Sequence, residues 1–285
     1  MKKNVLLTLI VAIIVSTLAL GHSYRQKAAP APALTPTPVD DVGEVIKEKP
    51  PRTLYDIEAA YDGLNTIKAH MDLTFVNDSG DHMKELHFHL YPNIFKNSMA
   101  IPFPRADIPL VFPQGFNAGG IDIKKVTQEN HVLEFSLYND GLMLVVTPRD
   151  PLEPGDIERI GITFEIKVPK ANFRFGYQNF GGGGTTMSLG NWYPVLAVYE
   201  KGKWNDNGPQ SVGDWTYSDM ADYSIRFTVP ANYTVAASGV MVEDELQGDS
   251  RIFCYEGEKL RDFASAISNN YNVAQDMYSD IKVYS

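Results

Sequence analysis

The sequence predicts an all-β protein, an antiparallel saddle-shaped β-sandwich that follows a signal or anchor helix and a disordered linker. Residues 67–75 alternate apolar and polar side chains, and a period of two places one face of a strand in a core and the other in water. Turn-forming residues such as Asn139-Asp140-Gly141 and Pro154-Gly155 separate many short runs of this kind. No amphipathic helix of more than a few turns is evident, which favours a sandwich or a saddle-shaped sheet.

The first residues predict export. Lys2 and Lys3 precede an apolar stretch of residues 5–20, which is the layout of a secretory signal. This stretch is shorter than the ~20 residues that a membrane-spanning helix needs, so cleavage is favoured over anchoring. The small residues Ala19 and Gly21 suit a signal peptidase. We therefore expect residues 1–21 to be a signal peptide or signal anchor, and an extracellular or cell-surface location, with residues 5–20 as the only contact with a membrane.

Residues 22–51 are rich in Ala and Pro and have no apolar periodicity. Such a composition buries too little apolar surface to offset the entropy of ordering, and it predicts a semi-rigid, disordered linker. A leftover propeptide is the alternative. Residues 52–285 are long enough for one large β domain or for two small ones, and we favour one.

The charge of the domain excludes one class of partner. The first fifty residues hold 6 of the 25 basic and 4 of the 35 acidic residues, so the remainder carries a formal net charge of −12. Such a surface repels nucleic acid and offers no basic patch to acidic lipid. Cys254 is the one cysteine, so no internal disulfide can form and the core must supply the stability alone.

The strands are expected in the following order. Residues 67–75 and 86–90, joined by the turn residues 77–81, predict a hairpin. The same alternation recurs at 160–168 and 223–229, and in shorter runs near residues 121, 132, 142, 235 and 252. Residues 258–268 allow either a helix or another strand. Residues 280–285 again alternate like a strand, and the absence of a polar tail predicts that the architecture is interrupted there.

Several segments together resemble a known family. They are Thr53–Asp62 (TLYDIEAAYD), Leu73–Phe95 with its Leu-Tyr-Pro-Asn ending, Gly119–Val126, Leu152–Asp156 (LEPGD), Arg174–Phe180, the segment Leu189–Gly239 that contains Asn-Trp-Tyr-Pro, and Arg261–Ser268. Their order is similar to that of the N-terminal β domain of the membrane alanyl aminopeptidases, which are zinc metallopeptidases of the gluzincin group. The likeness covers roughly residues 54–284 and rests on the order of the segments, with no single diagnostic motif.

The resemblance implies a role on the substrate side of an enzyme. In that family the β domain packs on a thermolysin-like domain that carries HExxH, and it helps to hold the N-terminus of a peptide substrate. HExxH is absent from the 285 residues, so zinc is expected only in a catalytic domain that this chain lacks. The family's Gly-Ala-Met-Glu-Asn-like strand is also missing, and only Asn191 is chemically suited to bind an amine, without a secure match to the family position. The sequence therefore assigns no catalytic, cofactor-binding or metal residues to this chain.

A second function stays open. Trp192, Tyr193, Trp204, Trp215 and Tyr217 concentrate aromatic side chains within a short stretch, which predicts either core and interface or a platform for peptide or glycan. The alternative hypothesis is therefore a stand-alone, cell-surface binding module.

Residues 82–89 contain a tempting metal pattern. On a strand, Glu85, His87 and His89 share a face, and two His at i and i+2 can bind one metal ion, with His70 or Asp72 as a third ligand. The spacing matches no zinc-protease motif, and the polar side of a half-buried strand is the favoured interpretation.

Three further patterns carry little weight. Gly181–Gly184 lacks the Lys of a phosphate loop and predicts a hairpin tip. No GxSxG motif positions a serine nucleophile. Asn77 and Asn232 each begin a sequence that fits a glycan acceptor.

Overall fold

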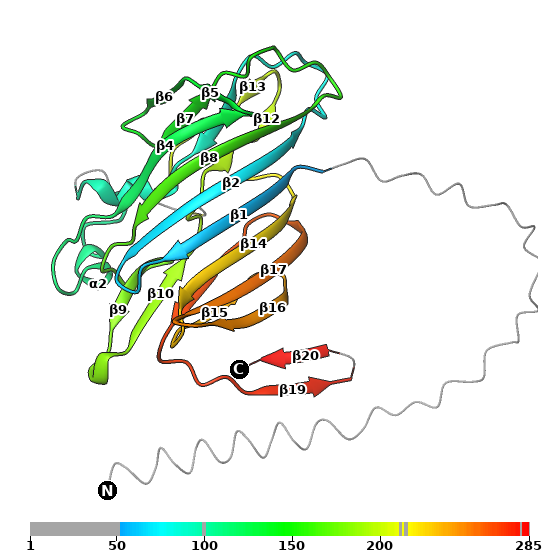
Figure 1. Cartoon of the computed structure of the whole chain (residues 1–285). Coiled ribbons are helices and arrows are strands. Elements are labelled where there is room, and N and C mark those ends of the chain that lie inside the picture. The colour runs from blue at the N-terminus through cyan, green and yellow to red at the C-terminus, as the bar shows by residue number, and fades with distance from the viewer. Residues whose placement is uncertain (1–51, 99–100, 211–212, 214–215, 280, 285) are drawn as a thin grey trace, which may run out of the picture. The chain divides into compact units, whose positions relative to one another are not determined.

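A computed structural model describes residues 52–98, 101–210, 213, 216–279 and 281–284. The expected signal segment, residues 1–21, and the expected linker, residues 22–51, lie outside these ranges. Figure 1 shows a mostly β protein with short helical turns. The helical elements are η1 (Tyr91–Lys96), α2 (Ile108–Val111) and η2 (Gly181–Gly183). In the ranges that the structure describes, no helix has both the length and the apolar character that crossing a membrane requires.

The largest sheet has eight strands, in the order β16-β17-β14-β1-β2-β8-β4-β5. Their bounds are β1 Leu54–Tyr61, β2 Thr66–Val76, β4 Gly120–Gln128, β5 His131–Leu133, β8 Ile157–Lys167, β14 Ala221–Pro230, β16 Val240–Gln247 and β17 Ser250–Leu260. Neighbours pair antiparallel except β1 and β14, which are parallel. The sheet is therefore mixed, which corrects the expectation of a purely antiparallel arrangement. A parallel pair needs a long crossover connection, and alternation along a strand does not reveal it.

Two four-stranded sheets contribute to the same core. One has the order β15-β18-β10-β9, with β15 Thr234–Ala237, β18 Ser265–Ser268, β10 Thr185–Leu189 and β9 Phe175–Asn179. The other has the order β11-β3-β7-β6, with β11 Val195–Leu196, β3 Leu86–His89, β7 Met143–Val146 and β6 Phe135–Tyr138. The pairs β12 (Tyr199–Glu200) with β13 (Lys203–Trp204), and β19 (Gln275–Tyr278) with β20 (Ile281–Tyr284), form separate two-stranded ribbons.

The core is one hydrophobic cluster, and all three larger sheets contribute side chains to it. Every second residue of β1, β2 and β14 is buried, as the alternation in the sequence predicts. Trp192 lies at the centre of the cluster, with its ring centroid 6.5 Å from that of Phe164 in β8 and 5.5 Å from that of Phe227 in β14. The connection between β10 and β11 thus supplies the largest side chain of the core.

The hairpin expected from residues 67–75 and 86–90 is wrong. β2 pairs with β1 and β8, whereas β3 pairs with β7 and β11 in another sheet. The alternation of apolar and polar residues predicts which face of each strand is buried, but it does not predict which strand pairs with it. Residues 258–268 form no helix, and the alternative strand expected at residues 261–264 is also wrong. β17 continues to Leu260 and β18 begins at Ser265, so residues 261–264 connect two strands.

Candidate functional site

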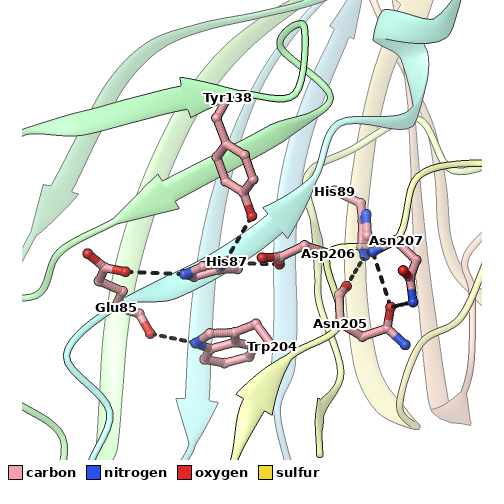
Figure 2. Close-up of polar contacts among 8 residues, drawn as sticks. All are labelled: Glu85, His87, His89, Tyr138, Trp204, Asn205, Asp206 and Asn207. Atoms are coloured by element: carbon pink, nitrogen blue, oxygen red, sulfur yellow. Dashed lines mark hydrogen bonds and ion pairs between the residues drawn. The ribbon is translucent and has the colours of Figure 1, made fainter.

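The segment that carried the metal hypothesis forms a polar cluster on β3. We call Glu85, His87, Tyr138, Trp204 and Asp206 the His87 cluster (Figure 2). His87 Nδ1 lies 3.0 Å from Asp206 Oδ1, and Nε2 lies 3.3 Å from Glu85 Oε2. The imidazole stacks on the indole of Trp204, with 5.5 Å between ring centroids. Both ring nitrogens of His87 therefore face carboxylates of this chain.

His89, two residues further along β3, makes a different set of contacts. Its side chain is buried, and Nε2 donates to the carbonyl oxygen of Asn205 at 2.9 Å, which requires the proton on Nε2. Its ring stacks on Tyr91, with 5.0 Å between centroids. Burial lowers the pKa of His89, because the charged imidazolium is poorly solvated there. The neutral ring serves here as a hydrogen-bond donor.

The third ligand expected from the sequence lies elsewhere. His70 and Asp72 are on β2, in the eight-stranded sheet, where His70 Nδ1 lies 3.0 Å from Thr163 Oγ1 and Asp72 pairs with Arg159 at 2.7 Å. Within the described residues, no three His, Cys, Asp or Glu side chains converge as a metal site. The expected polar side of a half-buried strand is present only in part, because Glu85 precedes β3, His87 is half-buried and His89 is buried.

The His87 cluster holds the loop that contains Trp204 and Asp206 against β3. Trp204 Nε1 donates to the Glu85 carbonyl oxygen at 3.1 Å, and the amide of Ala197 donates to the His87 carbonyl oxygen at 2.8 Å. The segment 197–208 is thereby tied to Glu85 and to β3 by side chains and backbone. A hollow of about 490 Å³ lies beside it, lined by acidic and basic side chains that include Glu85, Asp206 and Lys203. Because acidic and basic side chains are mixed, the lining of the hollow favours neither anionic nor cationic ligands.

The aromatic residues singled out in the sequence do not form one surface. Trp192 and Tyr193 are fully buried in the core, and Trp204 belongs to the His87 cluster. Tyr217 is 49% exposed, and Trp215 lies outside the described residues. The core interpretation is correct for Trp192 and Tyr193, so these two side chains contribute to no surface for peptide or glycan.

Asn191 lies in the turn between β10 and β11. It is buried, at 5% exposure, and its backbone adopts a left-handed conformation with φ of 51°. Asn tolerates this region better than most residues do. The turn is closed by the Gly190 amide, which donates to the Arg174 carbonyl oxygen at 2.7 Å. The position explains Asn191 by backbone geometry and gives it little access to a substrate.

One face of the sheet β15-β18-β10-β9 is lined with small side chains. Its other face buries Met187, Leu189, Val235 and Ile267 in the core. The register places the following outward residues side by side, and we call them the small-residue face: Thr186, Ser188, Thr234, Ala236 and Ala266. All five are exposed or half-buried. Small side chains permit another backbone to approach closely at β10, β18 and β15, whereas β9 presents the longer, exposed Gln178 beside Thr186.

The structure also locates the glycine-rich segment and the two candidate glycan acceptors. Gly181–Gly184 forms the tip between β9 and β10, as expected, with Phe180 beside it 47% exposed. Asn77 is fully buried, and its Nδ2 donates to the carbonyl oxygens of Asp81, Leu152 and Glu153. The folded chain therefore offers no glycan acceptor at Asn77, whereas Asn232 is exposed.

Comparison with known proteins gives a likeness in structure alone. The sequence matches no family model, and no curated protein matches it either. An M1 zinc metallopeptidase from Deinococcus radiodurans superposes with a TM-score of 0.50 at 15% identity, over 82% of this chain and 46% of that chain. A mutant described as a two-domain M1 zinc metallopeptidase bound to L-arginine gives 0.51 at 14% identity, with the same coverage.

These values define a class of fold. Most of this chain has the fold of part of an M1 zinc metallopeptidase, and it spans under half of the length of the structures that it matches. At this level of identity the likeness establishes the fold alone, so the activity has to be argued separately.

Two features of these sites have no strong local signal in the sequence. Asp206 and Tyr138 reach His87 from positions 119 and 51 residues away, and no local pattern marks them. The small-residue face was equally hidden, because its five members are scattered over three strands. A strand that alternates apolar residues with Ala, Ser or Thr was the available signal, as in β10 and β15.

Proposed function

We propose that this chain is the substrate-side β domain of an exported zinc aminopeptidase-like protein. It packs on a separate thermolysin-like domain that holds the zinc, and it has no peptidase activity alone. The observation that carries this proposal is the fold shared with under half of an M1 zinc metallopeptidase, over 82% of this chain. Zinc in the partner would polarise the scissile carbonyl and activate water, while the β domain helps to fix the peptide.

The small-residue face is the surface that we assign to this partner. Its side chains lie next to one another on β10, β18 and β15, and the opposite face of the same sheet packs in the core. A patch of Ala, Ser and Thr can be covered by a second domain at little cost, because few rotamers are frozen and the hydroxyl groups can pair across the interface.

The alternative of a stand-alone binding module has lost its main support. It depended on a shared aromatic surface, and Trp192 and Tyr193 are in the core. We therefore propose the domain of a larger enzyme alone.

The first test concerns activity. The purified chain, supplied with zinc, is expected to leave an aminoacyl chromogenic substrate unhydrolysed, because the described residues bring no three metal ligands together. Turnover that a chelator abolishes would overturn the proposal.

The second test concerns the partner. The HExxH-bearing polypeptide from the same genome is mixed with this chain, and association is followed by size-exclusion chromatography and titration calorimetry. Ala266→Arg, in the small-residue face, should weaken association by about tenfold or more, since a buried unpaired charge costs well over 1.4 kcal/mol. Ala60→Arg is the matched control, because Ala60 is exposed on the outer face of the eight-stranded sheet. Equal affinity of the two variants would remove the small-residue face as the interface.

A further inference from the structure

The segment Asn205–Gly208 contains the one Asn-Gly pair in the 285 residues. Asn207 is exposed, and the segment follows β13 directly. Asn205 Oδ1 accepts hydrogen bonds from both the Asn207 amide, at 3.2 Å, and Asn207 Nδ2, at 2.9 Å (Figure 2). The side chain of Asn207 is thus held near its own backbone, at a position that water reaches.

An Asn-Gly pair with this exposure can react with itself. The backbone nitrogen of Gly208 attacks Cγ of Asn207, a nitrogen–carbon bond forms, and ammonia leaves with the proton of the attacking amide. Water then opens the five-membered imide at either carbonyl, which yields aspartate or isoaspartate. Glycine favours the attack because it lacks a Cβ and its backbone turns freely. The sequence of steps consumes water alone and needs no oxidant or enzyme.

The neighbours of Asn207 fasten the loop to β3. The Asn205 carbonyl oxygen accepts the hydrogen bond from His89, and the Asp206 carboxylate faces His87 at 3.0 Å. A carboxylate at position 207 has no Nδ2, so the side-chain hydrogen bond to Asn205 Oδ1 would be lost. It would also add negative charge next to Asp206. Isoaspartate would also lengthen the backbone by one bond at this point.

We propose that Asn207 is a site of spontaneous deamidation, and that the product loosens the segment 203–208 from β3. The reaction converts one exposed side chain and thereby disturbs the contacts of two buried or half-buried histidines. It acts on the loop beside the hollow of about 490 Å³, a region separate from the small-residue face.

The modification itself is tested by ageing the full chain in mildly alkaline buffer, followed by peptide mass mapping. Mass gain is expected first in the peptide that contains Asn207, with an isoaspartate component detected by a methyltransferase assay. Gly208→Ala should suppress the product to the level of other Asn residues. A Cβ at Gly208 would meet only Asn139 Nδ2, at 3.7 Å, so the variant keeps the fold. Product that forms first at another Asn, or equally in Gly208→Ala, would overturn the assignment.

The structural consequence is tested by hydrogen exchange on fresh and aged chain, and on Asn207→Asp. Faster exchange is expected for the amides of Ala197 and Asn205, which donate to backbone oxygens at 2.8 Å each. The amide of Ala69 in the middle of β2 serves as the internal reference. Unchanged exchange in both the aged chain and Asn207→Asp would refute the loosening, even if the mass gain is found.

Discussion

At the scale of single residues, two carboxylates oppose each other on the outer face of the large sheet. Asp56 of β1 lies directly opposite Asp72 of β2. Partial burial, and then the charge of Asp72, raise the pKa of Asp56, and Arg159 offsets part of this effect. Like charges directly opposite each other destabilise a sheet. The fold therefore keeps Asp56 ionised at neutral pH at a cost in stability.

Asp56→Asn should stabilise the protein at neutral pH. Because the pKa of Asp56 is raised on folding, its ionisation opposes folding fully above the folded-state pKa and not at all below the ordinary pKa of an aspartate, 3.8. A gain within the range of about 0.2–1 kcal/mol for cross-strand pairs is expected near pH 7, and none near pH 3. Urea unfolding at both values measures it. Asp122→Asn is the control, since Asp122 is 62% exposed and pairs with Lys96, and it should give no gain.

His89 predicts a pH dependence of the opposite kind. Its pKa is lowered on folding, so the unfolded chain binds the proton more readily. The contribution of His89 to stability is complete above about pH 6.5 and declines as the pH falls from there towards the folded-state pKa. His89→Gln keeps a donor for the Asn205 carbonyl oxygen but cannot titrate, so its melting temperature should fall less between pH 7 and pH 5. His82→Gln, at an exposed position, should behave like the wild type. Parallel curves for wild type and His89→Gln would contradict this assignment.

At the scale of elements, the crossing from β2 to β3 depends on one buried amide. Asn77 donates to three carbonyl oxygens, and its own amide donates to the Asp156 carbonyl oxygen at 2.9 Å. These bonds join the end of β2 to the turn before β8 and turn the chain towards another sheet. What the sequence suggests as a hairpin turn is a connection between sheets.

Asn77→Ala should destabilise the protein by about 2 kcal/mol or more, because it removes three hydrogen bonds that contribute ~0.5–1.5 kcal/mol each. Ser79→Ala provides the comparison. Ser79 Oγ donates to Asn77 Oδ1 at 2.7 Å at a partly exposed position, and its loss should cost about 1 kcal/mol or less. Denaturant unfolding of both variants decides, and equal losses would show that the crossing does not depend on the amide.

The elements show what a single sequence can and cannot predict. The alternation in residues 67–75, 160–168 and 223–229 located β2, β8 and β14 and their buried faces, because the side-chain period of a strand is a local property. The partners of these strands depend on contacts between distant residues, so the parallel pairing of β1 with β14 was not foreseeable. The same limit applies to the His87 cluster, whose members come from three separate parts of the chain.

At the scale of the whole molecule, the described residues form one hydrophobic β core and no assembled metal centre. The resemblance found in the sequence and the fold shared with M1 zinc metallopeptidases agree on the kind of scaffold. The chemistry remains a proposal, since one scaffold can serve several functions. Binding measurements on variants of the small-residue face test the proposal, because a domain that works with a catalytic partner must present a surface to that partner.

The position of β1 also bears on how the chain reaches its fold. β1 begins at Leu54, yet it lies between β2 and β14, and its partners in β14 begin at Asp222. During synthesis one edge of this strand stays unpaired until Asp222 and the residues that follow it have been made. Contacts of such long sequence separation slow folding and leave strand edges open to aggregation. We therefore expect the eight-stranded sheet to close late in folding, when β14 pairs with β1.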